Sequence, residues 1–313
     1  VEGRVRAVAL LPLERIALER ARARRPVPGG DLGDESWIQF GLQALLSVSG
    51  RVRLLAQPAS AVSIKDDGSP ATKLESDIEA SVRRALRGFA PEASFMGEES
   101  GGDLRLPGWA VVIDPIDGTY AYLSQTETFA SVMTVFRDGE PRIGFVASPL
   151  TGEVGYAAAG GRSRLIRLNL FGEDDQGADL PLVRAGPSPL LVNVHPARDI
   201  GGTLADLMRA WRSDGVSVVR APGGSPSWAL LGAARGHFTY VNGWRGAPAA
   251  PWDLAAGVLL VQGAGGDVVD LSGHPIDPLG HEGPFVAGVR AEHRERILTL
   301  LESSGDGEGE PAG

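Results

Sequence analysis

The sequence contains no cysteine among its 313 residues. Disulfide bonds, thiolate metal sites and cysteine nucleophiles are therefore excluded, so any catalytic chemistry has to use oxygen or nitrogen groups. Lysine is scarce as well, because only Lys65 and Lys73 occur and arginine supplies the remaining positive charge. The lack of cysteine does not identify a redox compartment, since a cytosolic protein can also lack it.

Long apolar runs are missing too. None is long enough to span the hydrocarbon core of a bilayer. The first stretch, residues 1–13, is apolar in places but is interrupted by Glu2, Arg4 and Arg6, which makes it a poor secretory signal. We therefore expect a soluble, cytoplasmic protein with no membrane partner.

An excess of basic charge is also absent, because the net charge is −9. This balance disfavours a general nucleic-acid or membrane-surface binder, although a local basic patch is compatible with it. The composition, 43% hydrophobic and 22% charged, is ordinary for a globular protein. A chain of this length can bury a large core, as one large domain or two smaller ones.

The pattern along the chain predicts four segments. Residues 1–33 form an arginine-rich N-terminal extension, which we expect to be flexible. Residues 34–185 read as an α+β part with two helices, then an antiparallel meander of strands between residues 129 and 170. Residues 186–302 alternate strands and helices, as in an α/β layer. Residues 303–313 are rich in Gly, Glu and Asp, so we expect a disordered tail.

The most informative stretch is residues 109–119, where an apolar, β-branched run ends in Asp114-Pro115-Ile116-Asp117-Gly118-Thr119. Proline lacks an N–H group, so we expect Pro115 to stop the strand's hydrogen bonding. Gly118 and Thr119 would open a helix, whose free N–H groups attract anions. Two carboxylates beside an anion cradle favour a phosphate held on a divalent metal. The plainer alternative is a strand followed by a tight turn.

Other acidic residues favour the metal interpretation. Glu75 stands at the entrance of a predicted helix, Glu98-Glu99 follows a short strand and a glycine, and Asp253 stands at the start of another predicted helix. Magnesium prefers oxygen ligands. Asp253 alone would be read as an ordinary helix cap.

Together these motifs resemble the inositol monophosphatase family. The resemblance rests on Gly97-Glu98-Glu99-Ser100, on the 114–119 motif, and on Trp252-Asp253 with the downstream Gly263-Ala-Gly-Gly266. It extends over residues 34–302. Two separated motifs in the right order are more specific than either one alone.

The resemblance implies an α+β fold, a layered αβαβα sandwich. It also implies hydrolysis of a phosphate monoester with two or three Mg²⁺ ions, inhibition by lithium, and a homodimer. Carried over by position, the implied metal ligands are Glu98, Asp114, the carbonyl of Ile116, Asp117 and Asp253. Thr119 and Glu98 would orient and deprotonate the attacking water, and the backbone at Gly118 and Thr119 would hold phosphate.

Glu75 departs from the family pattern, which has an aspartate there. Glutamate keeps the charge and reaches one methylene further. Either a water-mediated or third-metal role is kept, or the site is rearranged, with Asp77 as the fallback if the alignment is shifted. We assign the catalytic position to Glu75.

Candidate substrate contacts are Tyr120, His195 and Arg245. Tyr120 and Tyr122 could stack on a ring, although packing against the meander is expected for at least one of them. A histidine bonded to a local carbonyl and a solvated arginine are the plainer interpretations of His195 and Arg245. The sequence thus predicts a magnesium-dependent phosphomonoesterase acting on a small polyol, sugar or nucleoside phosphate. The alternatives are a 3′-phosphonucleotide or histidinol-phosphate phosphatase, and a non-enzymatic regulatory protein on a retained phosphatase fold.

Overall fold

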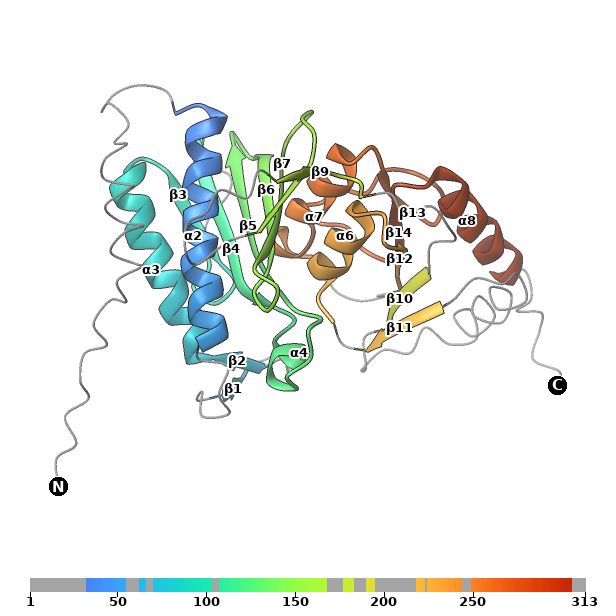
Figure 1. The fold of residues 1–313 in the computed structure, drawn as a ribbon, viewed down its shortest axis with the longest axis horizontal. Helices are drawn as coiled ribbons and strands as arrows, with labels where there is room; N and C mark the ends of the chain where they lie inside the picture. The colour runs from blue at the N-terminus through green and yellow to red at the C-terminus, as the bar shows by residue number, and fades with distance from the viewer. Residues whose placement is uncertain are drawn as a thin grey trace.

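The computed structural model describes residues 32–54, 62–65, 70–102, 107–167, 177–182, 190–194, 218–222, 224–243 and 249–305. Five layers follow one another across the molecule in Figure 1: a pair of helices, a seven-stranded sheet, a second pair of helices, a five-stranded sheet and a last helix. This is the predicted αβαβα sandwich.

The first layer consists of α2 (Asp34–Leu54) and α3 (Lys73–Phe89), which cover the outer face of the first sheet. In α3 the apolar residues Ile78, Val82 and Leu86 recur on one face, and all three are buried. This face fixes the rotation of α3, so the acidic residues on the same helix take defined positions toward the sheet.

The seven-stranded sheet contains the predicted meander. Its strand order is β3-β4-β5-β6-β7-β8-β9. β3 pairs parallel with β4, and every later neighbour pairs antiparallel. The bounds are β3 (Ser94–Gly97), β4 (Trp109–Asp117), β5 (Ala130–Arg137), β6 (Glu140–Ser148), β7 (Glu153–Ala158), β8 (Arg164–Arg167) and β9 (Ala178–Asp179).

The end of β4 differs from our prediction, because the strand continues through Pro115 to Asp117. Asp114 pairs with Val132 and Asp117 with Ala130, so three steps on β4 oppose two on β5. This bulge accommodates a proline that cannot donate to the ladder. The Pro115 carbonyl instead accepts a hydrogen bond from Ser131 Oγ at 2.6 Å. The bulge therefore extends the strand while bending it at the two aspartates.

The middle helices are α6 (Pro226–Ala234) and α7 (Pro251–Gly263), which contact both sheets. Small residues allow α7 to lie very close to the first sheet. A Cβ atom on Gly144 of β6 would stand only 2.7 Å from Ala256 Cα. This close approach places the start of α7, and hence Asp253, at the same end of the sheet as the end of β4.

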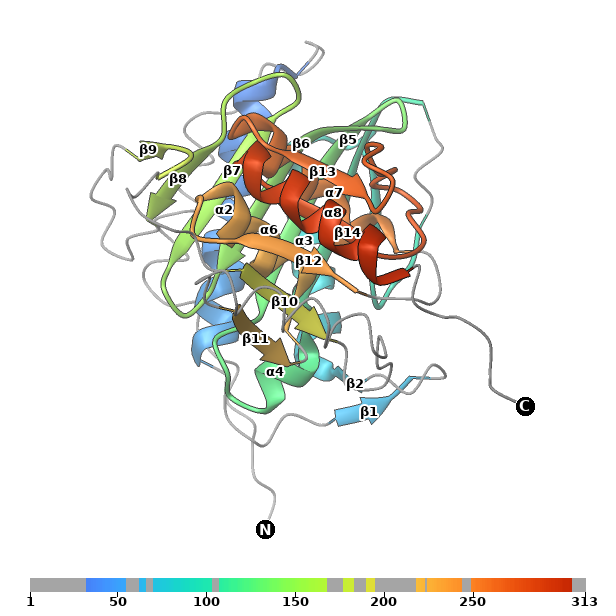
Figure 2. The same ribbon diagram turned by 90° about the vertical axis from the view of Figure 1, so that its right-hand side faces the viewer.

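The second sheet has the order β11-β10-β12-β14-β13, and β10 pairs parallel with both of its neighbours. Figure 2 shows α8 (Ala291–Gly305) lying across this sheet. The bounds are β10 (Leu190–Val194), β11 (Val218–Pro222), β12 (Thr239–Asn242), β13 (Asp267–Asp270) and β14 (Phe285–Gly288). α8 reaches three residues into the predicted tail. Residues 195–217, which belong to the stretch predicted to alternate strands and helices, lie outside the described residues.

Two short elements complete the end of the first sheet that carries the aspartates. The hairpin of β1 (Val62–Ile64) and β2 (Pro70–Thr72) lies next to α4 (Thr119–Leu123), which follows directly after β4 (Figures 1 and 2). α4 agrees with the expectation that Gly118 and Thr119 open a helix. Across the part of the chain that is described, none of the helices has the length and apolar character needed to cross a membrane.

Candidate active site

The two aspartates of β4 have different partners. Asp114 Oδ1 accepts a hydrogen bond from the backbone N–H of Ile116 at 2.8 Å. Asp117 Oδ2 accepts from Ser225 Oγ at 2.5 Å and from the N–H of Ser227 at 3.1 Å. Both carboxylates are buried. The end of β4 is thus joined directly to the start of α6, which lies more than a hundred residues later in the chain.

Gly118 makes the turn between β4 and α4. Its φ of +91° lies in the left-handed region, and a Cβ atom there would stand 3.1 Å from the backbone nitrogen of Ser225. Glycine is therefore required both by the conformation and by the nearby start of α6. This turn brings Thr119 to the first position of α4.

Glu75 reaches Thr119. Its Oε1 lies 3.0 Å from Thr119 Oγ1, and its Oε2 accepts a hydrogen bond from the N–H of Thr72 at 2.5 Å. The side chain is fully buried, and this burial raises its pKa to about 7. Asp77, the fallback, instead pairs with Lys73 and is half exposed, so Glu75 is the α3 acid that faces the site.

Glu98 and Glu99 follow β3 and share one cation. Lys65 Nζ lies 2.6 Å from Glu98 Oε1 and 2.5 Å from Glu99 Oε1. Burial lowers the pKa of Lys65, but its hydrogen bonds to the two glutamates outweigh that effect and raise the pKa above its ordinary value. The Lys65 ammonium group is therefore charged and held against the acidic turn.

Asp253 is the third residue of α7, and its Oδ2 accepts the N–H of Ala250 at 2.8 Å. Ser227 Oγ donates to the Asp253 carbonyl at 2.9 Å. Burial, followed by the negative charge of Asp117, raises the pKa of Asp253 to about 8. Asp253 thus stands at the third helical position, and Ala250 rather than Asp253 is the N-cap of α7.

The acids of the cluster carry like charges, which repel one another. Burial raises the pKa of Asp117 to about 6, although hydrogen bonds from Ser225 and Ser227 pull it down. Burial and the charges of Glu98 and Asp117 raise the pKa of Asp114 well above its usual range. Excess negative charge in a buried place is the electrostatic condition that a bound cation relieves.

The donor set fits a hard divalent cation, because every candidate ligand is an oxygen atom. Within the described ranges, however, no three acidic or histidine side chains are already grouped closely enough to hold a metal. Their oxygens have protein partners instead: Lys65 contacts Glu98, and Ser225 and the N–H of Ala250 contact Asp117 and Asp253. Each of these contacts uses one oxygen of its carboxylate, so the second oxygen of Glu98, Asp117 and Asp253 is the one that a cation would meet.

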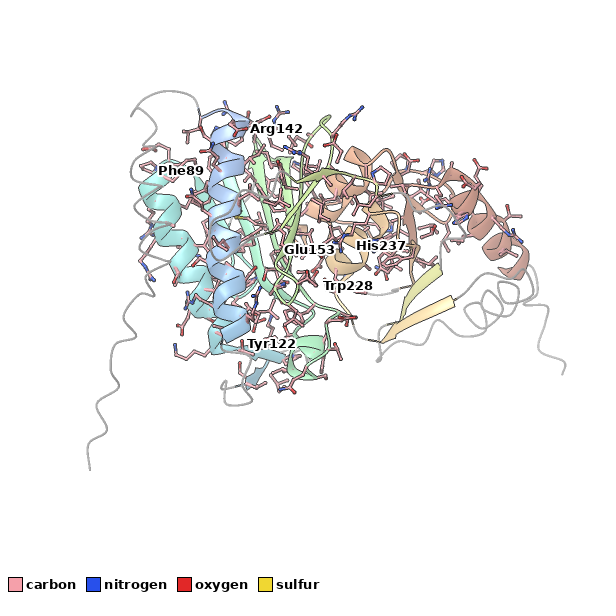
Figure 3. The ribbon with its side chains drawn as sticks, in the orientation of Figure 1. Phe89, Tyr122, Arg142, Glu153, Trp228 and His237 are labelled. Carbon is pink, nitrogen blue, oxygen red and sulfur yellow. The ribbon has the colours of Figure 1, made fainter. Side chains whose placement is uncertain are left out.

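The predicted substrate contacts differ in their exposure and in whether the structure describes them. Tyr122 is buried on α4, with its ring 5.4 Å from that of Phe129, and Figure 3 labels it on that helix. Tyr120 is 49% exposed. One tyrosine therefore packs into the core, as expected, and the other is available at the surface. His195 and Arg245 lie outside the described residues.

Two supporting residues, Ser227 and Glu79, were not identified from the sequence. Ser225 connects Asp117 to the start of α6. Its hydroxyl donates to Asp117 and accepts the N–H of Trp228 at 2.9 Å, which makes it the N-cap of α6. A serine two residues after this cap was a weak signal for Ser227. For Glu79 the signal was its position one helical turn after Glu75.

Comparison with known proteins agrees with the family resemblance of the sequence motifs. A model described as the inositol monophosphatase family matches residues 35–306. The probable inositol 1-monophosphatase ImpA of Mycobacterium tuberculosis is 30% identical over 274 residues, which cover 85% of this chain and 94% of that protein. The histidinol-phosphatase of the same organism is 29% identical, with coverages of 77% and 87%.

Two further matches are a third relative and a solved structure. The 3′(2′),5′-bisphosphate nucleotidase CysQ of Shigella flexneri is 27% identical, covering 75% of this chain and 89% of that protein. The structure of extragenic suppressor protein suhB from Bartonella henselae matches with a TM-score of 0.70 at 21% identity, covering 85% of this chain and 98% of that one. At that identity the structural match supports the fold alone.

Proposed function

This chain belongs to the inositol monophosphatase family, and on that premise we propose that it is a magnesium-dependent phosphomonoesterase acting on a small phosphorylated metabolite. The observation that carries the proposal is the contact between Glu75 and Thr119, 3.0 Å apart, at the edge of a cluster of buried acids. A buried carboxylate joined to a hydroxyl is suited to accepting a proton from water.

The acidic cluster forms the cation site in this proposal. Glu98, Asp114, the carbonyl of Ile116, Asp117 and Asp253 hold two or three Mg²⁺ ions. When bound, Mg²⁺ supplies positive charge that neutralises a phosphate group and makes a water molecule more acidic. Residues of the chain position the phosphate and the water and take up a proton.

Thr119 and Glu75 provide the path for that proton. The Thr119 hydroxyl donates to Glu75 Oε1, so its oxygen can accept a hydrogen bond from the attacking water. As the water oxygen bonds to phosphorus, its proton passes through the hydroxyl to Glu75, and Glu98 assists at the same water. The phosphorus–oxygen bond to the alcohol breaks, and the alcohol takes a proton from solvent.

Backbone groups at Gly118 and Thr119 hold the phosphate. The left-handed Gly118 leads directly into the first turn of α4, where N–H groups have no partner within the helix. Phosphate at this position would lie next to both the Thr119 hydroxyl and the aspartates of β4.

The leaving group is a ring-bearing alcohol, with a nucleoside preferred over inositol or histidinol. Tyr120 is the basis, since its half-exposed ring follows Thr119 directly and can stack on a base. The named relatives act on three different phosphate esters according to their names, so family membership alone does not select one. His195 and Arg245 stay predictions for substrate contact.

A second candidate function is a binding or regulatory protein on the same fold. The observation that favours it is Lys65, whose ammonium group lies 2.6 Å from Glu98 and 2.5 Å from Glu99 and offsets part of their negative charge. Against it stands the burial of Glu75, Asp114 and Asp117, since a pure binding protein has no need to bury three carboxylates at this end of the sheet.

A phosphate-release assay tests the proposal. Protein stripped with EDTA would be given inositol phosphate, histidinol phosphate or adenosine bisphosphate, with and without Mg²⁺. We expect release only with Mg²⁺, and fastest from the adenosine compound. Release that ignores Mg²⁺, or no release from any phosphate ester, would overturn the proposal. A Tyr120→Ala variant that kept the same order of substrates would overturn the choice of a ring.

A further inference from the structure

Glu79 is a buried carboxylate that the proposed chemistry does not use. It lies one helical turn after Glu75 on α3 and is 1% exposed. Its Oε1 accepts the backbone N–H of Glu99 at 2.9 Å, and its Oε2 accepts the N–H of Ser100 at 3.0 Å. Both hydrogen bonds end on the turn that carries Glu98, so α3 is tied to that turn at two neighbouring peptides.

The turn lies tightly over this carboxylate. A Cβ atom on Gly97 would stand 2.2 Å from Glu79 Oε2 and 2.7 Å from Oε1, so only a glycine fits above it. Hydrogen bonds between Gly97 and Gly101, at 3.2 and 2.8 Å, close the turn from the other side. Arg83, one turn further along α3, donates to Ser100 Oγ at 2.7 Å. The backbone from 97 to 101 is therefore fixed by α3.

Burial of Glu79 has an electrostatic cost. Desolvation raises the pKa of its carboxyl group, while the hydrogen bonds from Glu99 and Ser100 lower it. An apolar side chain would avoid this cost but would leave two backbone N–H groups without their acceptor. The carboxylate is the side chain that satisfies both donors at once, because it offers two oxygens in one plane.

Fixing this turn also fixes the position of Glu98. The N–H of Glu98 donates to the Ile113 carbonyl at 3.2 Å, on the residue before Asp114. The turn thus sets how Glu98 stands relative to β4 and its aspartates. Lys65 contacts the side chains of Glu98 and Glu99, whereas Glu79 contacts the backbone of the turn, so the two supports act on different atoms.

We propose that Glu79 is a positioning residue for the cation site: its carboxylate holds the turn 97–100 so that Glu98 faces Asp114. The proposal rests on the proposed function, because it assumes that Mg²⁺ binds at Glu98. Residues that orient metal ligands typically change metal affinity by about 10- to 100-fold when they are replaced.

The test is calorimetric titration of Mg²⁺ into metal-free protein, comparing wild type with Glu79→Gln. Glutamine has nearly the same shape but places an NH₂ group against one of the two N–H donors. We expect the Mg²⁺ Kd to rise by about 10- to 100-fold. At saturating Mg²⁺, we expect kcat to return to within a few-fold of wild type, since the ligands themselves are intact.

Asp77→Asn is the matched control, because Asp77 lies on the same helix but is half exposed and pairs with Lys73. We expect it to leave the Mg²⁺ Kd unchanged. If Glu79→Gln fails to fold, Gly97→Ala keeps the carboxylate and displaces it with a methyl group, and the same weakening is expected. An unchanged Kd in the folded variant, or equal weakening in Asp77→Asn, would overturn the proposal.

The titration distinguishes a failure of the proposed function from a failure of the role assigned to Glu79. Wild-type protein that binds no Mg²⁺ would overturn the proposed function and this inference together. Wild-type protein that binds Mg²⁺ and releases phosphate, beside a Glu79→Gln variant with the same Kd, would overturn only the role of Glu79.

Discussion

The acids of the site are supported in two different ways on its two sides. On the side of α3 and β3, Glu98 stands on a turn held by another carboxylate, Glu79, and is neutralised by Lys65. On the side of α6 and α7, Asp117 and Asp253 accept hydrogen bonds from a serine hydroxyl and from backbone N–H groups at helix starts. On the side of α3 and β3, the support for Glu98 is a second negatively charged side chain. On the side of α6 and α7, the support for Asp117 and Asp253 consists of uncharged hydrogen-bond donors.

This difference indicates a division of labour. Uncharged donors at helix starts stabilise a carboxylate without adding an opposite charge, so the negative charge of Asp117 and Asp253 can still attract a cation. Glu98 has more acids around it and depends on Lys65 for balance. The α6 and α7 side therefore holds its carboxylates through uncharged donors, while the α3 side holds Glu98 through Glu79 and Lys65.

The largest expected effect is on Asp117, which links the two sides. Replacing it as Asp117→Asn preserves the shape and an oxygen that can accept from Ser225 and Ser227, but removes the charge. We expect loss of measurable phosphate release with an unchanged circular dichroism spectrum. Asp138→Asn is the matched control, because Asp138 lies in the β5–β6 turn at a φ of 54°, which asparagine also tolerates. Normal magnesium-dependent turnover in Asp117→Asn would refute the assignment.

Thr119→Val should have the next largest effect, because it removes the hydroxyl between water and Glu75 while keeping the volume. Proton transfer by a positioned group typically contributes about 10²- to 10⁴-fold, so we expect kcat to fall by about 10²-fold or more with little change in KM. Steady-state kinetics would measure this, with Thr299→Val on α8 as the control. A kcat equal to that of wild type would remove Thr119 and Glu75 from the proton path.

Ser225→Ala tests the neutral-donor side. The variant leaves Asp117 with the N–H of Ser227 and removes the N-cap of α6. We expect kcat/KM to fall by about tenfold and stability to fall by about 1 kcal/mol. Ser272→Ala is the control, since Ser272 contacts Asp270 through its backbone N–H. If kcat/KM stayed at the wild-type value, hydroxyl support of Asp117 would be unimportant.

The last prediction concerns stability against pH without metal, and it does not depend on turnover. The folded-state pKa values of Asp117, Glu75 and Asp253, about 6, 7 and 8, are raised above their ordinary values of about 4. The native state therefore binds more protons than the unfolded state between about pH 4 and pH 8, and its free energy of unfolding falls as pH rises through that window.

Thermal melts at about pH 5 and pH 8 would measure this fall in EDTA and in Mg²⁺. We expect the Tm to drop with pH in EDTA, to drop less in Asp253→Asn, and to recover in Mg²⁺. Equal pH dependence in wild type and Asp253→Asn would show that Asp253 has no raised pKa in the folded protein.

Much of this site could be predicted because its central motif is local. Asp114, Asp117, Gly118 and Thr119 lie within one strand, turn and helix start, so their spacing alone indicates that they lie together. The meander was predictable for the same reason, since its strands follow one another through short turns such as Asp138-Gly139.

The residues that were missed depend on contacts between distant segments. Ser227 reaches Asp117 across 110 residues, and Glu79 reaches Glu99 across 20. Neither pairing leaves a periodic pattern in the sequence. The bulge at Pro115 was missed because it depends on the partner strand β5 as well as on the proline itself.

The most direct test of the account is a crystal structure of the protein with Mg²⁺ and phosphate bound. The account predicts Mg²⁺ about 2.0–2.1 Å from oxygens of Glu98, Asp114 and Asp117, phosphate at Gly118 and Thr119, and the Lys65 ammonium group moved away from Glu98. Lys65 still bridging Glu98 and Glu99, with no metal at the aspartates of β4, would contradict it.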